Sequence, residues 1–169
     1  VVEHPIPRAT LSKMNNAKDV VNWVSNHAQD PVYRAIATAI TDSISPDIQI
    51  KLQGSGRRKN STRRGNYGFM QNRRTGDMSP GSGTITYWSE GMQEGTVTHE
   101  LVHAATTHVL HNPKTEKQKK AKVELLQAKR DIDKLIKTDP EQFTKLNKKE
   151  QISFHSVGSS IDEFITYTL

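Results

Sequence analysis

Two histidines and a glutamate stand close together in the order His99-Glu100-Leu101-Val102-His103. Residues four apart in a helix lie one turn apart on the same face, so both imidazoles could bind one ion at the about 2.0–2.1 Å expected for zinc–nitrogen bonds. Glu100 would lie about 100° around the helix from His99, which makes it a poor ligand but keeps its carboxylate within reach of a water on the metal. The pattern predicts metal-assisted hydrolysis, with Glu100 as the general base.

This geometry needs a helix, and the surrounding sequence predicts one from an N-cap at Thr96 to a stop at Asn112-Pro113. Apolar residues recur along one side of that segment, which indicates a buried face: Val97, Leu101, Ala104, Ala105 and Val109. In the alternative interpretation, the same segment is a surface helix that stacks two histidines and binds no metal.

A catalytic zinc usually has three protein ligands, so a third ligand is expected elsewhere in the chain. One known pattern places a histidine six residues after His103, but Val109 occupies that position. The best candidate is Glu163, in a helix that we expect over residues 161–169. Its neighbour Asp162 could replace it as the ligand, or could hydrogen-bond the free nitrogen of a liganding histidine.

Around this site, a run of three strand patterns lies between two groups of helical patterns. Helices are expected over residues 17–28, from Asp30-Pro31 to Ser45-Pro46, and over the Lys-rich residues 115–137, while strands are expected over 47–53, 66–72 and 84–88. A partner segment from Asp139-Pro140 would fold back on the Lys-rich helix. The sequence therefore predicts an α+β fold: a small antiparallel or mixed sheet of about three strands packed on the active-site helix, with N-terminal helices and a long Lys-rich helical hairpin.

Length and composition favour one soluble domain over residues 1–169, which we expect to be part of a longer chain. Within it we expect N-terminal helices in 1–46, the sheet and metal helix in 47–113, and the helical part with the third ligand in 114–169. The absence of cysteine excludes disulfides, thiolate zinc sites and cysteine nucleophiles. No apolar run approaches the roughly 20 residues of a membrane span, so none is expected.

The net charge of +6 suggests a possible contact with nucleic acid or an acidic partner. Lysines of the 115–137 segment alternate with acids, which is typical of a solvated helix face. A glycine- and serine-flanked loop over residues 54–65 contains no acid and is the better candidate surface. Its basic residues are Arg57, Arg58, Lys59, Arg63 and Arg64.

The stretch VTHELVHAAT (97–106), with the later DEFITYTL (162–169), resembles the zincin metallopeptidases. The similarity is to the gluzincin type, in which a glutamate on a later helix completes the site, and to the metallopeptidase-like domains of large phage and mobile-element proteins. This resemblance implies a zinc metalloendopeptidase with His99, His103 and Glu163 as ligands and Glu100 as base. A domain carried in a virion, or delivered into a host cell, would be compatible with it.

Two further roles follow from the same resemblance. In such enzymes the strand before the active helix is often an edge on which an extended peptide substrate pairs, and here it would consist of Thr84, Ile85, Thr86, Tyr87 and Trp88. His155 and Tyr167 are candidates for stabilising the charge of the transition state. Alternatively, Tyr167 packs its ring in a helix and His155 is an exposed loop residue.

Two other functions remain open from the sequence. The chain could be a non-catalytic basic module for nucleic acid or an acidic partner, with a structural or vestigial zinc site. It could also be a zinc-dependent hydrolase that uses the same water activation on a non-peptide amide.

Overall fold

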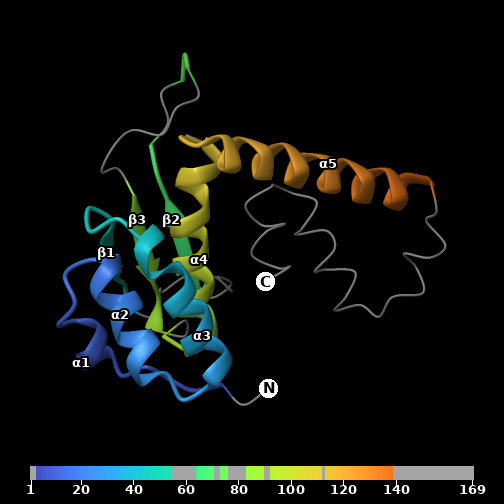
Figure 1. The fold of residues 1–169 in the computed structure, drawn as a ribbon. Coiled ribbons are helices and arrows are strands. Elements are labelled where there is room, and N and C mark those ends of the chain that lie inside the picture. Colours follow the sequence, from blue (N-terminus) through green and yellow to red (C-terminus); the bar gives the residue numbers. More distant parts are fainter. Residues whose placement is uncertain are drawn as a thin grey trace. The chain divides into compact units, whose positions relative to one another are not determined.

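The computed structural model describes residues 3–54, 64–70, 73–75, 83–89, 92–111 and 113–138. The chain divides into two compact units, Val1–Ala105 and Thr106–Leu169, with the boundary inside one helix. Five α-helices and a three-stranded mixed sheet occur among the described residues, which confirms the predicted α+β fold (Figure 1).

The sheet of the first unit has the strand order β1-β3-β2. Its strands are β1 (Gln49–Leu52), β2 (Gly65–Gly68) and β3 (Thr84–Tyr87). β3 runs parallel to β1 and antiparallel to β2, so the chain crosses from one edge to the other before it fills the centre. All three strands lie within or next to the ranges predicted for them, 47–53, 66–72 and 84–88.

The expectation that residues 84–88 form the edge of the sheet is wrong. β3 is the central strand, and its backbone hydrogen-bonds on both sides. Even at its end, the Tyr87 carbonyl accepts from the Gln53 amide at 2.9 Å, and the Trp88 amide donates to the Arg64 carbonyl at 3.0 Å. The backbone of a peptide substrate therefore cannot pair with this strand, because both of its sides are already hydrogen-bonded to neighbouring strands.

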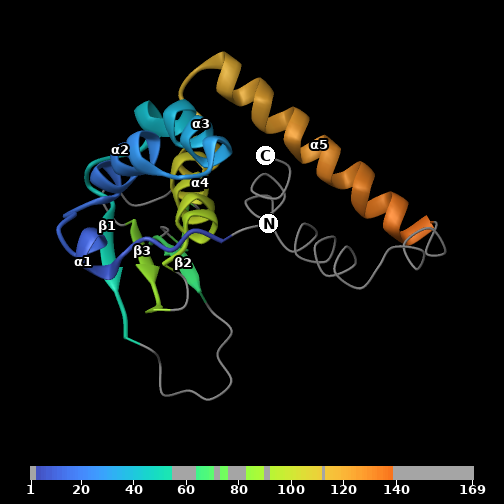
Figure 2. The same cartoon turned by 90° about the horizontal axis from the view of Figure 1, so that it is seen from below.

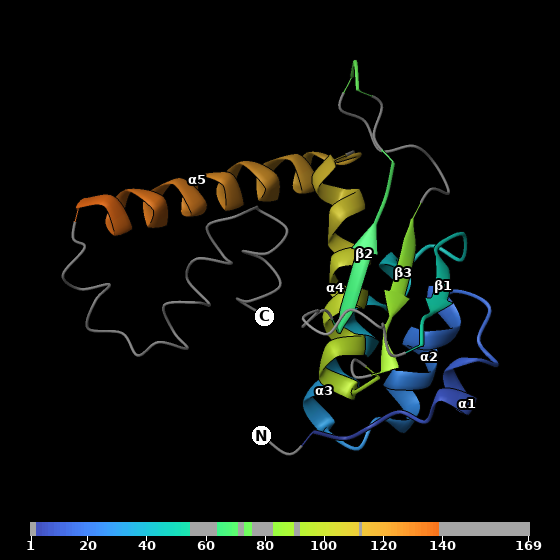
Figure 3. The same cartoon turned by 180° about the vertical axis from the view of Figure 1, so that it is seen from behind.

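Helices cover one side of the sheet, as Figures 2 and 3 show from below and from behind. They are α2 (Ala17–His27), α3 (Pro31–Ile40) and α4 (Glu94–His111). The side chain of Asn16 caps α2 by accepting from the Asp19 amide at 3.0 Å, and Asp30 caps α3 by accepting from the Val32 amide at 2.8 Å. The helix predicted up to Ser45-Pro46 ends as α3 at Ile40 and continues as the 3₁₀ turn η1 (Thr41–Ser43). A short helix that the sequence did not predict, α1 (Arg8–Leu11), completes this part.

The hydrophobic core lies between the sheet and these helices. Along β3, Ile85 and Tyr87 are fully buried, while Thr84 and Thr86 on the other face are half-buried. The buried side chains of α2 and α4 belong to the same cluster, including Val20, Val24, Val97 and Leu101. This packing holds α4 against the sheet, because sliding the helix would expose large apolar side chains.

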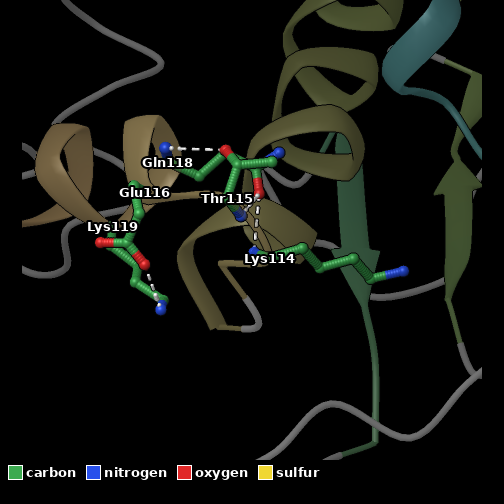
Figure 4. Close-up of polar contacts among 5 residues, drawn as sticks. All are labelled: Lys114, Thr115, Glu116, Gln118 and Lys119. Atoms are coloured by element: carbon green, nitrogen blue, oxygen red, sulfur yellow. Dashed lines mark hydrogen bonds and ion pairs between the residues drawn. The ribbon is translucent and has the colours of Figure 1, made fainter.

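The described part of the second unit contains helix α5 (Glu116–Thr138), which matches the predicted Lys-rich helix. Figure 4 shows how it begins: the Thr115 hydroxyl accepts from the Gln118 amide at 3.1 Å, and Gln118 Oε1 accepts from the Thr115 amide at 3.1 Å. This reciprocal pair is a capping box, with glutamine as its second member. The predicted partner segment from Asp139 onward lies outside the described residues. Among the described helices, none has both the length and the apolar content to cross a membrane.

Candidate metal centre

Helix α4 carries both histidines and begins at Glu94, two residues before the predicted N-cap at Thr96. The first helical bond runs from the Val97 amide to the Gln93 carbonyl at 2.8 Å. The Glu94 carboxylate is buried and accepts hydrogen bonds from the amides of Gln29 at 2.6 Å and Asp30 at 3.1 Å. This link ties the start of α4 to the loop before α3, which explains the earlier start.

The predicted buried face of α4 is confirmed where its side chains are described. Val97 and Leu101 are fully buried, and Ala104 and Ala105 are nearly so. The side chain of Val109 lies outside the described residues. The histidines therefore project from a helix whose rotation is fixed by its packing.

The two imidazoles meet as the i, i+4 spacing predicts. His99 Nε2 and His103 Nε2 are 3.1 Å apart, and the rings form an edge-to-face pair with centroids 4.7 Å apart and planes at 80°. Two nitrogens that bind one zinc ion tetrahedrally at about 2.05 Å would lie about 3.3 Å apart. The observed spacing thus fits two corners of a tetrahedral site, and the residues present fit zinc.

Both histidines favour the neutral form that a metal requires. Burial lowers the pKa of His99, and burial together with the neighbouring His99 lowers the pKa of His103 to about 4. A proton is therefore a weak competitor for these nitrogens near neutral pH. The same 3.1 Å separation also suits a hydrogen bond between two neutral imidazoles, in which the shared proton occupies the place of the ion.

The Glu100 side chain lies against the sheet. It is 6% exposed, and its side chain packs against the backbone of Gly65 at the start of β2. Tyr87 of β3 lies nearby: burial, and secondarily the Glu100 carboxylate, raises the pKa of this phenol well above its ordinary value. The Tyr87 hydroxyl is therefore a neutral donor, and it donates to the Val97 carbonyl at 3.2 Å.

Only part of the predicted site falls on described residues. Among these, no group of three or more histidine, aspartate or glutamate side chains could hold a metal. The candidates for the third ligand and for transition-state stabilisation lie outside the described residues: His155, Asp162, Glu163 and Tyr167. The described site thus consists of the histidine pair, Glu100 and the parts of β2 and β3 that support it.

The predicted basic loop is described only at its two ends, residues 54 and 64–65. Arg64 forms an exposed ion pair with Glu3 at 3.1 Å, and Arg57, Arg58, Lys59 and Arg63 lie outside the described residues. A nucleic-acid contact through this loop remains a prediction.

Sequence reasoning missed Gly65, Glu94 and the link from Tyr87 to α4. For Gly65 a signal was present, since a glycine inside a strand often marks the close approach of another group. For Glu94 and Tyr87, nothing local distinguishes these residues from an ordinary first-turn acid and an ordinary strand aromatic.

Comparisons of the chain with family models, with curated proteins and with solved structures gave no match. The functional interpretation therefore depends on the residues and their geometry.

Proposed function

We propose that this chain is a zinc-dependent hydrolase of the zincin type that cleaves peptide bonds. The observation that carries the proposal is the convergence of two imidazole nitrogens to 3.1 Å on a buried helix, with a buried carboxylate on the residue after His99. His99 and His103 would hold the metal, and Glu163 is the proposed third ligand. When bound, zinc would polarise the scissile carbonyl and acidify the attacking water.

The chain's own residues divide the remaining work. The two histidines present neutral lone pairs toward one point, because burial disfavours their charged forms. Glu100 accepts the proton of the attacking water on its carboxylate and returns it to the leaving amine. Its burial against β2 keeps this carboxylate in one place and limits its exchange with bulk water.

An extended peptide would lie along β2 in this proposal, in place of the central β3. β2 bonds to β3 on one side, and no other described strand pairs with its outer side. It is also the strand that contacts Glu100. A substrate added there by backbone hydrogen bonds would bring its peptide group close to the general base.

The proposal is tested by metal content and hydrolysis in single variants. Purified protein is dialysed against zinc, its bound zinc is measured by atomic spectroscopy, and hydrolysis is assayed on a library of fluorescence-quenched peptides. We expect one zinc per chain in the wild type, loss of that zinc in His99→Ala and His103→Ala, and its retention in the exposed-histidine control His27→Ala. Glu100→Gln should retain zinc and lose hydrolysis.

Several results would contradict this assignment. Full zinc occupancy in both His99→Ala and His103→Ala would refute the assignment of the metal centre. Wild-type hydrolysis by Glu100→Gln would refute the assignment of Glu100 as the general base. Zinc retention in Glu163→Ala together with zinc loss in Asp162→Ala would move the third ligand to Asp162. Zinc binding without cleavage of any peptide in the library would favour the non-peptide amide or the non-catalytic alternative.

A further inference from the structure

Gly65 has no room for a side chain, because Glu100 occupies the space. A Cβ atom built on Gly65 would lie 2.8 Å from Glu100 Cγ and 2.8 Å from Glu100 Oε1, which is closer than Cβ atoms pack in proteins. The φ angle of Gly65 lies outside the left-handed region, so backbone conformation does not require glycine here. The requirement is one of space, and the group that needs the space is the proposed general base.

The neighbouring strands leave little freedom to relieve such a clash by moving the backbone. Gly65 is the direct cross-strand partner of Tyr87, and the preceding Arg64 carbonyl accepts from the Trp88 amide at 3.0 Å, so the start of β2 is tied to β3. Tyr87 in turn donates to the Val97 carbonyl at 3.2 Å, which ties β3 to α4 one turn before Glu100. Strand and helix are thus held at a fixed separation, and the Glu100 side chain is the part that can yield.

We propose that Gly65 is a positioning residue, which sets the place of the Glu100 carboxylate by offering bare backbone at the start of β2. This inference rests on the proposed function, in which that carboxylate moves the proton. A base must lie within hydrogen-bond reach of the proton that it takes, and a misplacement of roughly 1 Å can lower the rate about 100-fold. Any side chain at residue 65 would impose a displacement of that order.

The strand contains its own control. The φ angle of Gly68, at the other end of β2, also lies outside the left-handed region. A Cβ atom built on Gly68 would meet only Asn66 Nδ2, at 3.6 Å, which is an ordinary contact. Gly65→Ala and Gly68→Ala therefore make the same chemical change in the same strand, with and without the clash. Alanine is the better strand residue, so Gly68→Ala should leave stability unchanged or slightly raised.

The experiment is a double-mutant cycle in urea, combined with zinc binding and peptide hydrolysis. We expect Gly65→Ala to lower the urea midpoint of the wild type but not that of Glu100→Ala, in which the clashing atoms are gone. Gly68→Ala should behave alike in both backgrounds. In hydrolysis, Gly65→Ala should lower kcat about 100-fold at an unchanged KM, while its zinc affinity, measured by competition with a chelating dye, stays within about twofold of the wild type.

Equal lowering of the urea midpoint by Gly65→Ala in both backgrounds would overturn the inference, and so would a wild-type kcat in Gly65→Ala. If Gly65→Ala alone does not fold, recovery of folding in the Gly65→Ala/Glu100→Ala double variant supports the inference, and failure to recover overturns it. If the wild type cleaves no peptide in the library, the proposed function fails separately. In that case the urea cycle alone decides whether Gly65 places the carboxylate.

Discussion

The metal-free protein should lose stability as the pH falls from 7 to 5, and His103 should account for much of the loss. Burial, and secondarily the neighbouring His99, lowers the pKa of His103 to about 4 in the folded state, against about 6.5 when the chain is unfolded. Between these values the unfolded state binds a proton that the folded state does not, so stability rises with pH in this window and falls on acidification. At pH 5 the corresponding loss is up to about 2 kcal/mol.

The assay is urea unfolding at pH 7 and pH 5 in the presence of EDTA. Both tryptophans, Trp23 and Trp88, lie in the first unit, so their fluorescence reports on the unit that carries the histidines. With an m value of roughly 2 kcal/mol per molar urea, the midpoint should fall by about 1 M more in the wild type than in His103→Gln. The exposed-histidine control His27→Gln should keep the wild-type pH dependence. The same pH dependence in the wild type and in His103→Gln would refute the reasoning.

Three other perturbations have distinct expected results. Glu94→Ala should lower the free energy of unfolding by about 2 kcal/mol in urea melts, because two part-buried amides lose the carboxylate that accepts from them, and should leave zinc affinity unchanged; wild-type stability would contradict this. Tyr87→Phe should cost about 1 kcal/mol for one lost hydrogen bond, again with normal zinc binding, and a shift in zinc affinity would count against the purely structural role. Zinc at 100 times its dissociation constant should raise the melting temperature of the wild type by roughly 5–10 °C and that of His99→Ala not at all, as measured by differential scanning fluorimetry.

Helices and strands of this chain could be predicted because their signals are local. The i, i+3, i+4 recurrence of apolar residues predicts α2, α4 and α5, period-2 alternation predicts β1, and β-branched and aromatic residues predict β3. The sequence predicts the start of α4 two residues late, at Thr96. The Glu94 carboxylate accepts hydrogen bonds from backbone amides more than sixty residues earlier in the chain, and these bonds hold Glu94 at the start of the helix. Such a partner leaves no trace in the residues around the helix end.

The order of the strands could not be predicted by the same means. The β-branched and aromatic residues of 84–88 indicate a strand, but they do not indicate which neighbours pair with it. One feature does distinguish β2 from β3: two of the four residues of β2 are glycine, which is typical of a strand at an edge or beside a closely approaching group. β3, which is β-branched and aromatic throughout, is the better central strand.

In the candidate site too, the local features could be predicted from the sequence and those that depend on strand pairing could not. His99, Glu100 and His103 are close in sequence, so the periodicity of one helix was enough to predict that the imidazoles meet. The support beneath Glu100 comes from Gly65 and Tyr87, which are far apart in the chain and become partners only through the antiparallel register of β2 and β3. The Tyr87 hydroxyl donates a hydrogen bond to α4, while Gly65, which has no side chain, leaves space for the Glu100 carboxylate. The position of the proposed base therefore depends on strand pairing as much as on the helix, which is why a variant in β2 should change the hydrolysis rate while the metal ligands remain intact.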